Sequence, residues 1–134
     1  MSGLVLKLNP RERVLVNGAV IENGDRRSRL SILTPNANIL RLRDAIRPDE
    51  VNTPVRRVCY IAQLVLSGDV TEDDAKHQIL RGIEQLSQAL RDDDSRIHLD
   101  NATEAVVQRD FYRTLKSLRN LLQREARLLA SAPQ

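Results

Sequence analysis

The chain has 134 residues, of which 41% are apolar, 29% are charged and 2% are aromatic, and its formal net charge is +3. This length fits one domain or two small modules, and the apolar content suffices for a modest core. A single cysteine excludes an internal disulfide, and the longest uncharged apolar run, residues 58–68, is too short to span a membrane. Without a signal-peptide pattern at its start, the chain is expected to be cytoplasmic, with no membrane contact.

The first part of the chain has the pattern of short β-strands. Asn17-Gly18 and Asn23-Gly24 are each predicted to form a two-residue hairpin turn, because Asn tolerates and Gly readily adopts positive φ. Around them lie segments rich in β-branched and other apolar residues, at 4–8, 13–16, 19–22, 28–33 and 38–43. This spacing predicts an antiparallel β meander or a small barrel-like module.

A boundary is predicted over residues 45–53, where the strand pattern gives way to helical periodicity. Thr53 is a suitable N-cap, and Pro54 suits the first helical position because its missing N–H would be unpaired there anyway. The first helix is expected to end near Ser67-Gly68.

Two further amphipathic helices are predicted after the first one. One begins at Thr71 and ends before the acidic residues 92–94, which are expected to form a solvated loop. The last starts near Asn101 and continues to about Ala130. The predicted fold class is therefore α+β, with a β-rich module followed by a three-helix module, at residues 1–50 and 51–134.

The charges are unevenly distributed along the chain. Residues 1–43 hold eight Lys/Arg and three Asp/Glu, residues 44–104 hold seven and thirteen, and residues 105–134 hold six and two. This distribution indicates two anion-binding surfaces, one on the β module and one on the last helix. The acidic middle is expected either to dock a partner or to neutralise one of these surfaces in part.

Arginine dominates the cations of the β module, and its planar guanidinium suits phosphate and base edges. The candidate RNA-binding residues are Lys7, Arg26, Arg27, Arg29, Arg41 and Arg43. A second basic surface is expected from Arg56, Arg57, Arg109, Arg113, Lys116, Arg124 and Arg127. For each group of this second surface an alternative to anion binding stays open. The cations of the last helix could form a solvated face, and those at the start of the first helix could pair with Asp49 and Glu50.

Residues suited to catalysis are few. His77 and His98 stand alone, and Cys59 lies in an apolar helical run, where it is expected to be a core residue. No nucleophile pattern, metal-ligand spacing or phosphate-binding glycine loop is present, so no enzyme activity, metal or cofactor is predicted. The aromatic residues are too few and scattered for a base-stacking platform.

Three segments carry a family resemblance: LVLKLNPRERVLVNGAVIENGDRR, NILRLRDAI and NTPVRRVCYIAQL. Together they resemble FlbT, the flagellin post-transcriptional regulator family of alphaproteobacteria. The resemblance implies a cytoplasmic protein that binds the 5′ untranslated region of flagellin mRNA and alters its stability and translation, acting opposite the FlaF-family regulator. It does not decide between repression and activation.

The N-terminal module is also similar to the carbon storage regulator family, CsrA. That resemblance implies a dimer formed by strand exchange and an RNA site between the first and last strands. Arg43 and Ile46 match the last strand of that family, whereas Leu8 replaces its basic position on the first strand. The alternative is a non-enzymatic adaptor whose helices bind flagellin, a secretion factor or a FlaF-family regulator, with an indirect effect on the mRNA.

Overall fold

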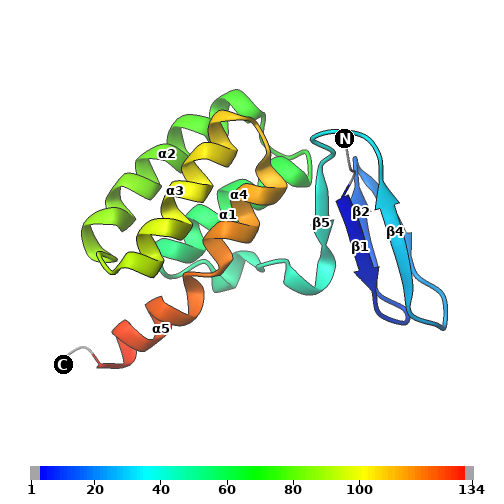
Figure 1. The fold of residues 1–134 in the computed structure, drawn as a ribbon, viewed down its shortest axis with the longest axis horizontal. Coiled ribbons are helices and arrows are strands. Elements are labelled where there is room, and N and C mark those ends of the chain that lie inside the picture. The colour runs from blue at the N-terminus through cyan, green and yellow to red at the C-terminus, as the bar shows by residue number, and fades with distance from the viewer. Residues whose placement is uncertain (1–3, 132–134) are drawn as a thin grey trace.

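The computed structural model describes residues 4–131. Figure 1 shows a small β module beside a bundle of helices, with strand β5 at the junction. The strands are β1 (Leu4–Leu8), β2 (Arg13–Val16), β3 (Ala19–Glu22), β4 (Ser28–Ile32) and β5 (Ile39–Arg41). The helices are α1 (Pro54–Leu66), α2 (Glu72–Ala89), α3 (Asp93–Val107), α4 (Phe111–Arg119) and α5 (Leu122–Ser131). Two short 3-10 turns, η1 (Leu42–Asp44) and η2 (Pro48–Glu50), connect β5 to α1.

The α+β class is confirmed, but the strands do not form one meander. They form a two-stranded sheet, β1-β4, and a three-stranded sheet, β3-β2-β5, both antiparallel. The first predicted hairpin turn is confirmed, with φ of 48° at Asn17 and 87° at Gly18. The second was wrong, because neither Asn23 nor Gly24 has positive φ, and the chain instead crosses from one sheet to the other.

Asn23 holds that crossover with its side chain. Its Nδ2 donates to the carbonyl oxygens of Asn9 and Arg26, and its Oδ1 accepts from Ser28 Oγ at 2.7 Å. Asparagine is favoured in such positions because its amide satisfies nearby backbone groups. Asn23 therefore stabilises the crossover through its side chain, and the Asn23-Gly24 pair does not form a two-residue turn.

Five helices are present among the described residues, where three were predicted. The start of α1 is as expected, with Pro54 in its first turn and Thr53 Oγ1 accepting from the Arg56 N–H. The predicted acidic loop was wrong: Asp92 caps α3 and Asp94 lies in its first turn, where the helix dipole favours negative charge. The predicted last helix is divided among α3, α4 and α5.

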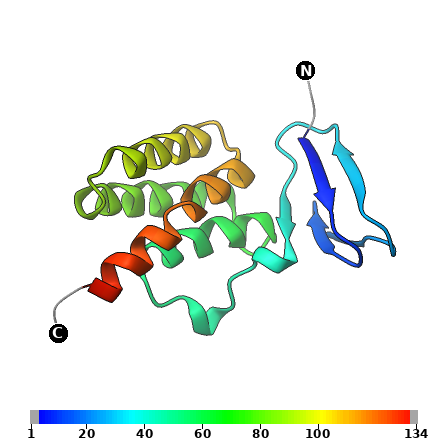
Figure 2. The same cartoon turned by 60° about the horizontal axis from the view of Figure 1, so that its bottom comes forward.

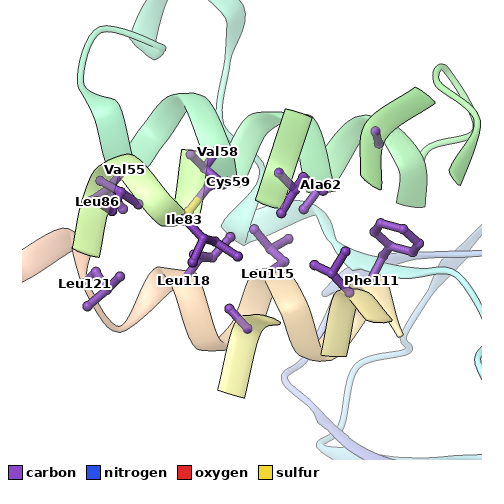
Figure 3. Close-up of a cluster of buried hydrophobic side chains, with 14 of the residues drawn as sticks. Val55, Val58, Cys59, Ala62, Ile83, Leu86, Phe111, Leu115, Leu118 and Leu121 are labelled. Atoms are coloured by element: carbon purple, nitrogen blue, oxygen red, sulfur yellow. The ribbon is translucent and has the colours of Figure 1, made fainter. Parts of the chain in front are cut away.

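The break between α3 and α4 is a Schellman motif. Arg109 has φ of 59°, and the Asp110 and Arg109 N–H groups donate to the carbonyl oxygens of Ala105 and Val106. A second break follows α4, where the Leu121 N–H donates to the Leu118 carbonyl oxygen. Between these breaks α4 packs along α1, as Figure 3 shows for Leu115, Leu118 and the other labelled core residues.

Two apolar clusters fill the molecule, one between the helices and one inside the β module. Leu40 belongs to the helical cluster and its neighbour Ile39 to the β cluster, while Tyr112 packs against both. The buried Gln63 amide adds two hydrogen bonds, to the Ile46 N–H at 2.7 Å and the Ile46 carbonyl oxygen at 3.0 Å. Apolar packing and hydrogen bonds thus join the β module to the helices.

Candidate nucleic-acid interface

Five of the six cations predicted for the β module line one open groove of about 450 Å³. It runs between the β1-β4 sheet and the end of β5, and its lining cations are Lys7, Arg27, Arg29, Arg41 and Arg43. Arg26, the sixth predicted residue, is exposed and does not line this groove. Arg43 was expected on a strand but lies in η1, because β5 ends at Arg41. We call this the basic groove.

The pairing of β1 with β4 places two cations side by side. Lys7 is directly opposite Arg29 in the antiparallel register, and both side chains are exposed while Leu6 and Leu8 face the core. Like charges in this position destabilise a sheet. Within residues 4–131, no ion pair involves Lys7, Arg27 or Arg29. Their positive charge is therefore available to an anion.

Arg41 has a different environment, because the buried Glu12 holds it. The Arg41 Nε and Nη2 atoms donate to the two carboxylate oxygens at 2.6 and 2.7 Å, and Nη2 also donates to the Lys7 carbonyl oxygen. The hydrogen bonds from Arg41 lower the pKa of Glu12 from 4.5 to about 2 despite its burial. The pair fixes Arg41 against β1 and keeps one wall of the basic groove in place.

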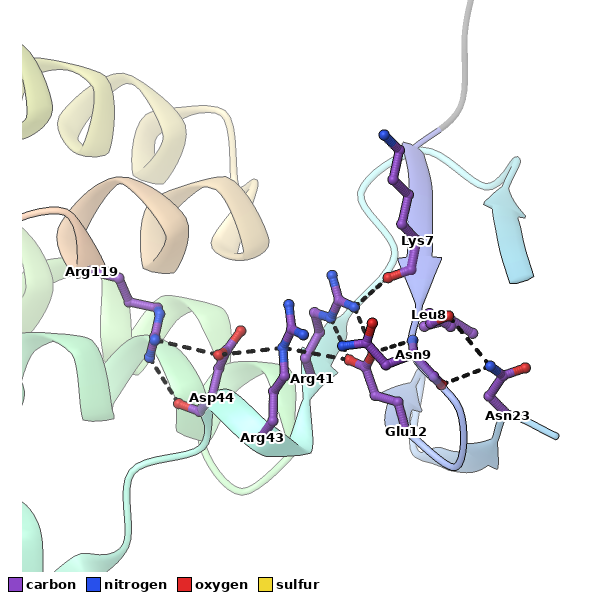
Figure 4. A network of polar contacts seen from close by, with 9 residues as sticks. All are labelled: Lys7, Leu8, Asn9, Glu12, Asn23, Arg41, Arg43, Asp44 and Arg119. Carbon is purple, nitrogen blue, oxygen red and sulfur yellow. Dashed lines mark hydrogen bonds and ion pairs between the residues drawn. The ribbon is translucent and has the colours of Figure 1, made fainter. Parts of the chain in front are cut away.

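Figure 4 shows how this pair continues toward the helices. Arg43 Nε lies 3.7 Å from Glu12 and 3.8 Å from Asp44, and Arg119 of α4 donates to the Asp44 carbonyl oxygen at 2.9 Å. A second open groove of about 360 Å³ lies along this line and shares Arg41 and Arg43 with the basic groove. Lys116 and Arg119 contribute its further cations. The two grooves thus adjoin each other between β1 and α4, and Asp44 lines the second one together with its cations.

The second basic surface predicted from helix geometry is not a single stripe. Its C-terminal members follow α3 or lie on α4 and α5, and within residues 4–131 three of these five are paired with acidic residues from the middle of the chain: Arg109, Arg113 and Arg124, but not Lys116 or Arg127. Arg109 contacts Glu72 and Asp73 at 3.2 and 2.7 Å. Arg113 lies 3.4 Å from Glu104, and Arg124 lies 3.1 Å from Asp92. Part of the expected neutralisation by the acidic middle is therefore present.

The remaining predicted cations do not line one common groove. Arg56 donates to the carbonyl oxygen of Glu50 at 3.2 Å, so it is held by backbone, whereas Arg47 pairs with the carboxylates of Asp49 and Glu50. The exposed Arg57 lines a groove between α1 and α2. Arg127 is exposed on α5, and Lys116 alone of this second set lines a groove with cations of the β module.

Groups suited to catalysis are not gathered at any of these grooves. Cys59 is fully buried, and burial raises the pKa of its thiol to about 12, so it is a core residue as predicted. His77 is exposed on α2, and His98 lies 3.4 Å from the Asn120 amide. Residues 4–131 contain no group of three His, Cys, Asp or Glu side chains that could hold a metal ion. No helix in that range is long and apolar enough to cross a membrane.

Three residues of the candidate site were not predicted: Glu12, Asp44 and Arg119. Glu12 lies between two arginines in RERV, which resembles a solvated turn, and only the fold brings Arg41 onto it. Arg119 lies outside the predicted helix stripe, because that stripe follows from the geometry of one straight helix. The alternation in NILRLRD, with two arginines before an acid, is the one local signal for the Arg43–Asp44 contact.

Comparison with known proteins gives the family. The model of the family described as "Flagellar protein FlbT" matches residues 4–129. The chain belongs to the FlbT family. The flagellum biosynthesis repressor protein FlbT of Caulobacter vibrioides is 29% identical over 122 residues, covering 91% of this chain and 86% of that protein. The probable flagellum biosynthesis repressor protein FlbT 1 of Bradyrhizobium diazoefficiens is 33% identical over 127 residues, covering 93% and 84%.

The names of these FlbT relatives describe a regulatory function and no catalytic one. The family assignment made from the three sequence segments is confirmed. No solved structure matches the chain, so the expected likeness of the β module to the CsrA fold stays a prediction.

Proposed function

We propose that this chain regulates flagellum biosynthesis by binding the 5′ untranslated region of flagellin mRNA in its basic groove, which alters the stability and translation of that mRNA. The proposed regulation is post-transcriptional and involves no enzyme activity. Arginine and lysine side chains hold the RNA by its phosphates. The FlbT relatives named as repressors favour repression as the direction of the effect.

The observation that carries the proposal is the pair Lys7 and Arg29. Two exposed cations stand opposite each other on neighbouring strands, with Arg27 beside them in the same groove, and no carboxylate in the described part of the chain pairs with any of the three. This arrangement costs folding free energy through repulsion, and a bound phosphate would relieve it. Cations kept only for solubility are usually interspersed with acids, as they are on the helices of this chain.

The test is binding of purified full-length protein to flagellin leader RNA over a salt series. We expect Lys7→Ser, Arg27→Ser and Arg29→Ser together to weaken binding and to reduce the slope of log affinity against log salt by about two, because about 0.7 is lost per phosphate contact to a single strand. The thermal midpoint of the triple variant should not fall, since exposed cations contribute little to folding.

The matched control removes the same charge from another face. Arg81, Arg91 and Arg96 are exposed on or beside α2 and α3, and none of them is in an ion pair within the described residues. Their combined replacement by Ser should leave the affinity within about twofold of the wild type. Equal losses in both triple variants would mean that net charge alone binds RNA, and absence of wild-type binding at low salt would exclude the RNA function.

A second candidate function is the adaptor, and one surface favours it. Helix α5 contacts α1 and then continues away from the bundle, as Figures 1 and 2 show. Its Leu128 and Leu129 are 48% and 55% exposed. We propose this face as the contact for a flagellin or a FlaF-family regulator. Replacing both leucines with Ser should abolish that complex, measured by calorimetry with the purified partner, and leave RNA affinity unchanged. An undiminished complex would exclude this face.

We further propose that the chain forms a dimer through β3. This strand is at the edge of its sheet, all four of its residues are exposed, and it contains neither proline nor lysine to prevent pairing with another chain. Val20 is 62% exposed at its centre. Val20→Lys is expected to convert the dimer to a monomer in light scattering, whereas the wild-type protein measured as a monomer would exclude the dimer.

A further inference from the structure

A third groove adjoins the second one. It lies between the β1-β4 sheet, the loop 33–37 and helix α4, and it encloses about 350 Å³. It shares Ile39, Tyr112 and Lys116 with the second groove. A nucleic-acid strand that follows Arg41 and Arg43 toward α4 would therefore reach the mouth of this third groove.

The chemical character changes at that point. The basic groove is lined by cations, whereas the third groove is lined mainly by apolar side chains: Leu4, Ile32, Leu33, Ala37, Ile39 and Tyr112. Tyr112 is half-buried, and its ring packs against both apolar clusters of the molecule, so it offers a rigid aromatic surface. Leu33 is 79% exposed, which is a large apolar surface for a loop to leave in water.

Polar groups stand at the edge of this apolar surface. Lys116 is exposed and in no ion pair within residues 4–131, and it faces both the second and the third groove. Asn36 and Asp110 also line the third groove, with Asp110 capping α4 through the Arg113 N–H at 3.1 Å. An amide and a carboxylate can pair with the amino and imino groups on the edge of a base, and a lysine can hold the adjoining phosphate.

We propose that the third groove receives an unstacked base of single-stranded RNA whose phosphates lie along the basic groove. This inference rests on the proposed function, and it defines the class of RNA. A paired and stacked base cannot enter the groove, so the ligand is a loop or an unpaired segment of the leader. Apolar and aromatic contacts with the base then add to the affinity contributed by the phosphates, without adding to its salt dependence.

The test compares two probes of equal backbone charge with the full-length protein: a single-stranded RNA of about 12 nucleotides and an abasic ribose-phosphate oligomer of the same length. Ala37→Phe fills the groove, and Leu33→Asp places a negative charge at its exposed edge. Each is expected to weaken RNA binding by at least about fivefold, the lower end for one stacked base, and Ala37→Phe is expected to leave binding of the abasic oligomer unchanged.

The salt slope of the Ala37→Phe variant should equal that of the wild type, because no phosphate contact is removed. Ile97→Asp is the control for Leu33→Asp, since Ile97 is an exposed apolar residue on α3, outside the three grooves. Near-ultraviolet circular dichroism shows whether the Phe variant is folded. Ala37→Phe and Leu33→Asp variants that bind RNA like the wild type, while the Lys7, Arg27 and Arg29 variant does not, would overturn this inference alone. Failure of the wild type to bind either probe would instead overturn the proposed function.

Discussion

Glu12 and Arg41 form a buried, two-pronged ion pair, with donor–acceptor distances of 2.6 and 2.7 Å between residues that are far apart in the sequence. The Glu12 side chain is 5% exposed and that of Arg41 is 14% exposed. Such a pair adds geometric definition as well as energy, because the planar guanidinium allows one orientation against the carboxylate. It ties the N-terminal strands to the strand that leads into the helices.

Glu12 makes the free energy of unfolding depend on pH in the acidic range. Its folded-state pKa of about 2 lies below the ordinary value of 4.5, so its contribution is complete above pH 4.5 and is lost as the pH falls toward 2. We expect Glu12→Gln to lower the free energy of unfolding at pH 7 by about 3 kcal/mol and to flatten the decline below pH 4.5. Urea titrations at several pH values measure both effects. A parallel decline in wild type and variant would contradict the assignment.

Gly82 allows a close approach of α1 to α2. A Cβ atom at this position would lie 2.5 Å from Val58 Cγ2, which is closer than carbon atoms approach in proteins. Although Ala is the better helix former by about 1 kcal/mol, we expect Gly82→Ala to destabilise the protein by about 1–3 kcal/mol. Adding Val58→Ala should recover part of that loss. Gln85→Ala, at an exposed position of α2, is the control and should be within about 0.5 kcal/mol of wild type.

Leu118 lies at the centre of the contact between α4 and α1 and is 0% exposed. Truncation at such a site removes buried methyl groups and leaves a cavity, so Leu118→Ala should cost about 2–5 kcal/mol in thermal or urea unfolding. Leu129→Ala, at an exposed position of α5, should cost far less. A loss below about 0.5 kcal/mol at Leu118 would mean that α4 is not packed against α1 in solution.

Glu125 attaches α5 to the start of α1. Its carboxylate is buried and accepts the Val55 N–H at 2.8 Å, at a helix N-terminus where negative charge is favoured. We expect Glu125→Ala to cost about 1–3 kcal/mol, because it leaves a buried donor unpaired, and to increase hydrogen exchange along α5. Glu125→Gln keeps an acceptor and should lose less. Equal effects of the two substitutions would exclude the capping role.

The helix ends show which features of the fold local sequence predicts. Both α1 and α3 end in a Schellman motif, but α1 uses Gly68 at φ of 85°, and α3 uses Arg109 at φ of 59°. Glycine at that position is an ordinary stop signal, so the end of α1 was predicted, whereas arginine gives no such signal and the end of α3 was not. The ion pairs of Arg109 with α2 help to hold this uncommon backbone conformation.

The candidate site, too, could be predicted from local sequence only in part. The arginines near the second Asn-Gly pair were recognisable as candidates because three of them lie close together in the sequence. The assembly of two of them, Arg27 and Arg29, with Lys7 in one groove was not predictable, since it depends on the long-range pairing of β1 with β4, which sets Lys7 opposite Arg29. The helix stripe was misjudged because angular spacing assumes an unbroken helix, and its acidic partners lie on other elements.

Strand β5 has a consequence for how this protein can be divided. Ile39 and Leu40 are consecutive residues whose side chains belong to different apolar clusters. Tyr112 packs against both clusters. A fragment that stops after the strands would expose Leu40 to water and lose the ring that covers Ile39. We therefore expect the strands and helices to unfold in one cooperative transition. The strands are therefore unsuited to transfer into another protein without the helices that cover them.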